Sequence, residues 1–479
     1  MAYSFYKSLE RWAFCMVKLT FKDEFKLLSD ELGRIFSSDF LEELAKAHKF
    51  KQRKGKLEPL DFVSLCSFFN EGSGVKSLSR LCALLTAERK VSLSTEGLNQ
   101  RFNKNAVDMM KVIFRQLFTR QFLKNKIPDL DAMGFSRIRI LDSSSFELPT
   151  MYEDEYLGCT KSKSGVKLQL EYELLTGSFL HLEVQNGRSS DQKYGPTLLK
   201  TIKKRDLIIR DLGYFNVEEL YQIAQKGAYY LTRLKPPTTL FTKKDEDYIK
   251  LDLAEVMDEM EEGEYRELVD IYATAKKHYI PRLILYKLTP GQIKKREKKR
   301  EKTEKKKGVK LSHPTKKLYK LNMFISNIPQ QSVPKEEIHL IYSLRWQIEI
   351  LFKTWKSLFQ IHKVKKMKLE RFECHLYGTL ISLLISSTIA FQAREYLLRK
   401  KKKETSEYKS ISITMEFIPK LFEAIISSKT SILKILKGIY SQIEKNGKKS
   451  HRKKKLTVFD ILKVSYERTV GKAAKDSAA

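Results

Sequence analysis

The stretch Ile341–Gln360, IYSLRWQIEILFKTWKSLFQ, has the apolar period of an amphipathic helix, and the rest of the chain is interpreted from it. At about 100° per residue, several polar side chains of such a helix fall within roughly 40° of Glu349. They are Tyr342, Arg345, Lys356 and Gln360. A separate stripe is apolar and would face a core: Ile341, Leu344, Ile348, Leu351, Trp355, Leu358 and Phe359. An acid, two cations and a phenol on one face suit a phosphate held beside a metal ion. An ordinary solvated face has the same composition, so the helix alone leaves both interpretations open.

The charge balance of the whole chain indicates a class of partner. The 479 residues include 91 Lys+Arg against 58 Asp+Glu, a formal net charge of +33. Such an excess favours a polyanionic partner through counterion release. Ribosomal, membrane-surface and nucleic-acid proteins share this property, so the charge indicates a class of partner but does not identify a reaction. The length and the 42% hydrophobic content predict more than one domain, or one core with large insertions.

Several classes of protein are excluded by what the sequence lacks. The cysteines are scattered without a CxxC pair, and the eight histidines form no HExxH motif. A disulfide framework or a zinc enzyme is therefore disfavoured, and a reducing cytosol is expected. The longest apolar run, Leu376–Phe391, is short for a membrane span and contains five Ser or Thr residues. We interpret it as a buried core helix of a soluble, cytoplasmic protein without a membrane partner.

The secondary-structure pattern and the charge of the sequence change along the chain, and these changes predict its domains. Residues 1–19 read as an uncertain leader, with Met16 as an alternative start. Residues 20–125 are helical with basic loops, which suits either a DNA-binding region or a plain helical packing domain. Residues 126–235 mix strands with crossover helices and predict an α/β core that resumes at 321–395. Residues 236–320 form an insertion that ends in a basic run, and residues 396–479 are basic and helical.

Two acids follow apolar strands and are candidate partners of Glu349. Asp142 ends RIRILD, and Asp211 ends DLIIRD. A charge at such a place costs desolvation unless something compensates it, although each acid could also simply begin a turn. Together the three carboxylates can hold two Mg²⁺ ions, or Mn²⁺, about 4 Å apart for phosphoryl transfer.

At this point the sequence resembles a known family. The spacing Tyr342-x2-Arg345-x3-Glu349-x6-Lys356 is similar to the Y-x2-R-x3-E-x6-K signature of the insertion-sequence-four family of bacterial DDE transposases, most of all its Bacillus insertion-element subgroup. Asp211-Leu212-Gly213-Tyr214-Phe215 resembles the second-aspartate motif of that family, and Asp142 falls where its first aspartate is expected. The resemblance covers roughly residues 20–470.

The resemblance implies a ribonuclease-H-like core interrupted by a β-rich insertion, with helical N- and C-terminal regions. Asp142, Asp211 and Glu349 would be the catalytic metal ligands for cutting element ends and joining them to target DNA. The partners would be double-stranded DNA, with its terminal inverted repeats and target sites, and a second copy of the chain in the DNA complex. The residues that contact DNA would be Tyr342, Arg345, Trp346, Lys356 and Arg233.

The chain also departs from the family pattern. The first motif has Ser144 where many relatives have threonine, and no tryptophan lies between Gly213 and Ile341. The C-terminal helices of residues 412–444 are a candidate dimer surface, although their apolar pattern also suits a helical core. Two other functions stay open: a basic nucleic-acid-binding protein without catalysis, and a nuclease of the same fold that cuts without joining.

Overall fold

The computed structural model describes residues 21–53, 55–69, 76–119, 133–159, 162–236, 238–307, 317–427, 431–450 and 456–464. The expected leader 1–19 and the alternative start Met16 lie outside these ranges. The chain forms two compact units. The first comprises residues 1–124, 355–397 and 403–449, and the second comprises residues 125–354, 398–402 and 450–479.

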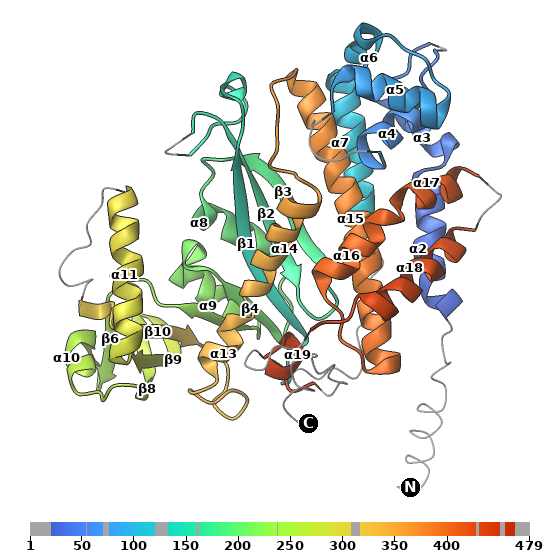
Figure 1. The fold of residues 1–479 in the computed structure, drawn as a ribbon. Helices are drawn as coiled ribbons and strands as arrows, with labels where there is room; N and C mark the ends of the chain where they lie inside the picture. Colours follow the sequence, from blue (N-terminus) through green and yellow to red (C-terminus); the bar gives the residue numbers. More distant parts are fainter. Residues whose placement is uncertain are drawn as a thin grey trace, which may run out of the picture. The chain divides into compact units, whose positions relative to one another are not determined.

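The first unit is helical in its described part. Its N-terminal helices are α2 (Phe21–Ile35), α3 (Ser38–Ala47), α4 (Pro59–Ser67), α5 (Leu78–Arg89), α6 (Thr95–Arg101) and α7 (Lys104–Thr119). The long helix α15 (Leu369–Lys401) runs beside α7 (Figure 1), where Phe114 meets Tyr377 edge to face. The last helices are α16 (Glu407–Glu416), α17 (Ile418–Ile426) and α18 (Ile432–Asn446). Since α17 and α18 pack against α2 and bury apolar residues such as Leu421 and Leu436, their apolar faces serve a core inside this unit.

Helix α15 is long and apolar enough to cross a membrane by length and composition. However, 89% of its most apolar window is buried within the protein, as in the core helix of a soluble domain. This agrees with the interpretation of Leu376–Phe391 as a core helix. A close approach to α4 adds to its burial, because Gly378 leaves no room for a side chain beside the backbone of Cys66.

The second unit is a mixed α/β structure, as the sequence predicts. In the described residues of this unit, ten strands form one sheet in the order β3-β2-β1-β4-β5-β10-β9-β8-β6-β7. Strands β1 (Arg137–Glu147), β4 (Asp206–Arg210) and β5 (Tyr229–Arg233) are parallel, and β2 (Gly165–Glu173) and β3 (Phe179–Asn186) continue antiparallel from β1. On the other side, β10 (Leu321–Ser326) pairs antiparallel with both β5 and β9 (His278–Lys287). The sheet ends with β8 (Tyr265–Ala273), β6 (Leu240–Lys244) and β7 (Asp247–Lys250).

Helices cover this sheet and hold its buried core. Helix α9 (Val217–Gln225) packs on β5 and β9, and its Leu220 and Ile223 join the core cluster of the sheet. Helix α10 (Leu253–Asp258) contributes Leu253 and Met257 to the same cluster. The basic run forms α11 (Pro290–Lys307), which stands beside the strands β8–β10 in Figure 1. The short helices α8 (Asp191–Tyr194), η1 (Thr150–Tyr152), η2 (Gly195–Thr201), η3 (Leu212–Tyr214) and α19 (Val458–Ile461) complete the unit.

One prediction, a single helix over Ile341–Gln360, is wrong in its continuity. The structure has α13 (Ile338–Ser343) and α14 (Trp346–Leu358), with Leu344 and Arg345 between them. Around this junction the backbone bonds tighten to i→i−3, from Arg345 N to Tyr342 O at 3.1 Å and from Gln347 N to Leu344 O at 3.0 Å. A turn of this kind has three residues, so each residue rotates further about the axis than in an α-helix. The helix is thereby interrupted, and Tyr342 lies on α13 whereas Glu349 lies on α14. The apolar stripe is nevertheless buried as expected at Ile341, Leu344, Ile348, Leu351, Trp355 and Phe359.

Candidate active site

The guanidinium of Arg345 brings the three predicted acids together. Its Nη1 lies 3.0 Å from Asp142 Oδ2, and its Nη2 lies 2.8 Å from Glu349 Oε1. Its Nε lies 3.6 Å from Asp211 Oδ1. The Arg345 side chain is 10% exposed, whereas Asp211 is 44% exposed, so the cluster opens to solvent on the Asp211 side. Three carboxylates that lie far apart in the sequence therefore share one cation.

Each acid is placed by a different element. Asp142 lies in the middle of β1, which continues to Glu147, so the prediction that this acid ends its strand is wrong. Because Leu141 is paired with Arg210, the last residue of the parallel strand β4, Asp142 and Asp211 nevertheless lie beside each other. Asp211 caps the short helix η3 by accepting a hydrogen bond from the Gly213 amide at 3.4 Å. Glu349 lies in the first turn of α14, one helical turn after Arg345, which explains their contact.

The environment of Asp142 disfavours its charge. Burial raises the pKa of Asp142 to about 6, and the charges of Asp211 and Glu349 act in the same direction. The Ser143 amide, which donates to Asp142 Oδ1 at 2.8 Å, and the Arg345 guanidinium lower it. A carboxylate with a raised pKa beside two other acids is typical of a functional site. The cluster keeps an excess of negative charge, since three carboxylates face one guanidinium, and this favours binding of a further cation.

The chemistry of these donors suits a divalent metal ion. Mg²⁺ and Mn²⁺ prefer carboxylate oxygens, and three acids with one cation leave the site electrostatically incomplete. In the described part of the chain, no three acidic, histidine or cysteine side chains are already spaced to hold an ion. The Arg345 guanidinium lies where the three carboxylates converge, so this side chain separates them.

Two of the other predicted residues lie next to this cluster. Tyr342 is buried, its hydroxyl donates to the Arg210 carbonyl at 3.4 Å, and its ring packs on Phe324. Burial raises the pKa of Tyr342 to about 12, so it is a neutral donor at physiological pH. Trp346 is 51% exposed, and its ring lies 5.2 Å from the Arg345 guanidinium carbon. An exposed indole beside the acids provides a stacking surface.

The remaining two lie further away. Arg233 ends β5, opposite Phe324 of β10. Burial lowers the pKa of both Arg296 and His339, and the charge of Arg233 acts in the same direction. Lys356 lies in the last turn of α14 and belongs to the first compact unit. Arg296 was not predicted, because it lies inside the basic run that looked uniformly solvated. It donates instead to the carbonyls of Tyr319 and Leu321.

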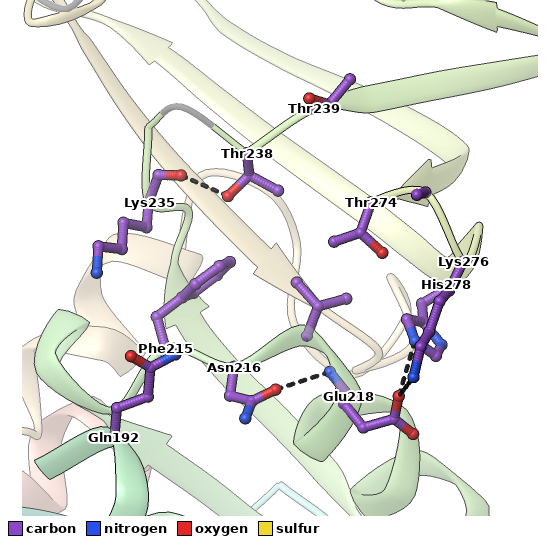
Figure 2. Close-up of a pocket in the computed structure, with 12 residues that line it drawn as sticks. Gln192, Phe215, Asn216, Glu218, Lys235, Thr238, Thr239, Thr274, Lys276 and His278 are labelled. Carbon is purple, nitrogen blue, oxygen red and sulfur yellow. Dashed lines mark hydrogen bonds and ion pairs between the residues drawn. The ribbon is translucent and has the colours of Figure 1, made fainter.

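A cavity of about 520 Å³, lined by both polar and apolar groups, lies directly after the Asp211 turn (Figure 2). Phe215 and the start of α9 form one wall, and Lys235, Thr238 and Thr274 contribute to the others. Glu218 lies 3.1 Å from Lys276 Nζ and 3.1 Å from His278 Nε2, and these contacts join α9 to the turn between β8 and β9. Hydroxyl and ammonium groups thus extend the polar surface away from the acids.

Comparisons with known proteins identify the family of this chain. Residues 133–385 match a family described as "Transposase DDE domain". The transposase for insertion sequence element IS231B of Bacillus thuringiensis subsp. berliner is 41% identical over 468 residues, which cover 94% of this chain and 98% of that protein. The transposase for insertion sequence element IS1151 of Clostridium perfringens is 36% identical over 457 residues, which cover 92% and 96%.

A solved structure gives a more distant likeness. The piggyBac transposase synaptic complex with hairpin DNA, determined by cryo-EM, aligns with a TM-score of 0.45 at 12% identity, covering 87% of each chain.

Proposed function

This chain belongs to the DDE transposase family of bacterial insertion sequences and is an enzyme that cuts and joins DNA, and from that premise we propose that Asp142, Asp211 and Glu349 are its catalytic carboxylates. Family membership also decides among the three functions that the sequence left open, in favour of the transposase. The family acts on DNA and uses divalent metal ions. We further propose that its DNA substrates are the terminal inverted repeats of its own element and a target site.

One observation carries the assignment of these residues. A single guanidinium contacts carboxylates from β1, from the turn after β4 and from α14. Glu349 lies more than a hundred residues after both aspartates, and no local feature of the sequence requires the three acids to meet. Their convergence supports a common chemical task.

The metal proposal is that these carboxylates bind two Mg²⁺ ions, with Mn²⁺ as an alternative. Bound divalent ions would activate the attacking oxygen and stabilise the leaving oxygen of an in-line displacement at phosphorus. The protein supplies carboxylate ligands, a burial that strengthens electrostatic interactions, and Arg345. With metal held by the carboxylates, the Arg345 guanidinium would be available to pair with a DNA phosphate in the fork geometry that arginine favours.

The same surface would bind the DNA end. Trp346 would stack on a terminal base, and the buried hydroxyl of Tyr342 would orient a phosphate. Lys356 and Arg233 would add charge to the path of the backbone. The cavity after Asp211 would accommodate part of the sugar–phosphate chain, since hydroxyl and ammonium donors are among the groups that line it.

The order of the strands supports a proposal for the domains. We propose that strands β3-β2-β1-β4-β5 with β10 are a ribonuclease-H-like core, which the sequence assigns to residues 126–235 and 321–395, and that residues 236–320 are the insertion. Residues 355–395 group with the helical unit. Residues 20–125 would bind DNA, and residues 396–479 would form the basic C-terminal region. The enzyme would act as a homodimer in its DNA complex, because two element ends are cut together, and it would work on the bacterial nucleoid.

The test is the substitution Glu349→Gln, which removes a charge and keeps the shape of the side chain. We expect loss of metal-dependent cleavage of DNA that carries the element ends, by at least about 10³-fold, with DNA affinity within twofold of wild type. Glu262→Gln, at an exposed glutamate of the insertion, is the matched control and should cleave normally. Cleavage at the wild-type rate by Glu349→Gln would disprove the assignment.

A further inference from the structure

A fourth carboxylate lies behind the catalytic acids, on the opposite face of the sheet. Successive side chains of a strand point to opposite faces, so Ser143 points away from Asp142. Ser143 is paired in register with Gln169 of β2, and both side chains meet Asp191 at the start of α8. Asp191 lies outside the family signature, and its sequence surroundings gave no reason to select it.

One oxygen of Asp191 accepts three hydrogen bonds. Asp191 Oδ1 lies 3.1 Å from Ser143 Oγ, 2.9 Å from Gln169 Nε2 and 3.0 Å from Lys167 Nζ. Gln169 is fully buried, and the Lys167 side chain is only 11% exposed. Donors that are buried in this way cost free energy when they lose their acceptor, so the geometry around Asp191 is strongly constrained.

Ser143 connects Asp191 to the first catalytic aspartate. Its backbone amide donates to Asp142 Oδ1 at 2.8 Å, while its hydroxyl donates to Asp191. Ser143 thus orients the Asp142 carboxylate through its backbone amide. Its side chain, on the other face of the sheet, is held by Asp191.

A parallel connection reaches the second catalytic aspartate. The turn that begins at Asp211 is closed by the Gly213 amide, which donates to Asp211 Oδ2. The next residue, Tyr214, donates its hydroxyl to Gln169, which also binds Asp191. Burial and the charge of Asp191 raise the pKa of Tyr214, so this hydroxyl stays a donor.

We propose that Asp191 is a positioning residue that holds the carboxylates of Asp142 and Asp211 in register with each other. The inference rests on the proposed catalytic role of these two aspartates. Asp191 acts through Ser143 on β1 and through Gln169 and Tyr214 on the turn after β4. Without it, β1 at Asp142 and the turn after β4 lose their common anchor, and the two carboxylates lose their fixed separation.

The experiment compares Asp191→Ala and Asp191→Asn with wild type. Because asparagine keeps an acceptor oxygen, we expect it to retain most of the cleavage rate, whereas alanine lowers the rate at least tenfold. Alanine should also raise the Mn²⁺ concentration required for half-maximal cleavage and speed amide hydrogen exchange in β1 around Asp142. DNA affinity should stay within twofold, whereas the melting temperature of Asp191→Ala should fall, because Lys167 and Gln169 lose their acceptor.

The controls separate positioning from simple structural support. Asp258→Ala removes an aspartate–lysine contact of similar length, 2.7 Å to Lys317, on α10 and should leave cleavage and exchange unchanged. Ser143→Ala should shift the Mn²⁺ requirement in the same direction as Asp191→Ala. The double variant should be no worse than Asp191→Ala, since the Ser143 hydroxyl acts only through its bond with Asp191.

The outcomes are decisive even if Asp191→Ala fails to fold, because Asp191→Asn and Ser143→Ala remain testable. An unchanged Mn²⁺ requirement and unchanged exchange in the folded variants would overturn the inference. Additive effects of Ser143→Ala and Asp191→Ala would do so too. Wild-type protein is assayed alongside Glu349→Gln: if wild type cuts and Glu349→Gln does not, the proposed function stands, and the Asp191 results bear on the positioning role alone.

Discussion

At the scale of single residues, Arg345 has two opposed effects on the active site. It neutralises part of the charge of Asp142, Asp211 and Glu349, and it lies where their oxygens converge. In DNA-free protein, Arg345→Ala should therefore bind Mn²⁺ at least about tenfold more tightly, or about 1.4 kcal/mol. Calorimetric titration with Mn²⁺ measures this change.

The same substitution should lower DNA cleavage, because the phosphate loses its partner. Arg345→Lys keeps the charge and should leave Mn²⁺ affinity close to wild type, although its geometry cannot replace the guanidinium fork. Weaker Mn²⁺ binding by Arg345→Ala would contradict the competition between arginine and metal at this site.

The buried imidazole of His375 makes the free energy of unfolding depend on pH. Its ring lies in α15, 5.3 Å from that of Phe102, and burial together with the charges of Arg371 and Lys76 lowers its pKa to about 3. The unfolded chain takes up a proton near pH 6.5 and the folded protein does not. The free energy of unfolding therefore falls as pH decreases from 6.5, by about 2 kcal/mol at pH 5.

Urea unfolding at pH 7 and pH 5 tests this dependence. His375→Phe cannot titrate and should lose that part of the change, while stacking on Phe102 is retained. The same pH dependence in wild type and His375→Phe would show that other groups cause it.

At the scale of elements, the approach of α15 to α4 depends on one glycine. A Cβ atom on Gly378 would lie 2.2 Å from the carbonyl oxygen of Cys66, so Gly378→Ala forces the helices apart. We expect a loss of about 1–3 kcal/mol in the free energy of unfolding. Gly438, in α18, has its nearest such neighbour, in the ring of Phe417, at 3.6 Å. Gly438→Ala should therefore be neutral or stabilise by up to about 1 kcal/mol. Equal effects of the two substitutions, measured by thermal unfolding, would refute this difference.

Some elements follow from local pattern. Helix Val217–Gln225 is an example, because its 3.6-residue apolar period coincides with the burial of Val217, Leu220 and Ile223. The break at Leu344 and Arg345 could not be predicted, since it contains no proline or glycine. It depends on tertiary contacts: Tyr342 packs on Phe324, and Arg345 is held by carboxylates from other elements.

The residues of the candidate site were likewise predicted only in part. The motif spacing predicted which acids belong together, and the structure brings them to one cation. The contacts of Asp191 and Arg296 were not predicted. Asp191 contacts donors on β1 and β2 that the register of the sheet brings together. Arg296 differs from the neighbouring cations by its hydrogen bonds to the carbonyls of Tyr319 and Leu321. Both depend on pairings between distant segments, which a local pattern does not contain.

At the scale of the whole molecule, the net charge of +33 predicts strongly salt-dependent DNA binding. The basic helix α11 is a candidate source of phosphate contacts. Replacing Lys294, Lys295 or Lys298 by glutamine should reduce the slope of log affinity against log salt by about 1 for each lysine that contacts a phosphate. Glu301→Gln, in the same helix, is the control and should not reduce it. Affinities measured across a salt series would reveal an unchanged slope if α11 does not contact DNA.

The position of Glu349 in the chain also affects when the enzyme becomes complete. Asp142 and Glu349 are separated by 207 residues, and the insertion strands lie between them. At ribosomal rates of about 5–20 residues per second, Glu349 is synthesised roughly 10–40 s after Asp142. A nascent chain that has reached the insertion carries Asp142 and Asp211 without their third partner and is expected to leave DNA uncut. Synthesis itself thereby delays DNA cutting until the chain has passed the insertion, and a message truncated there yields an inactive product.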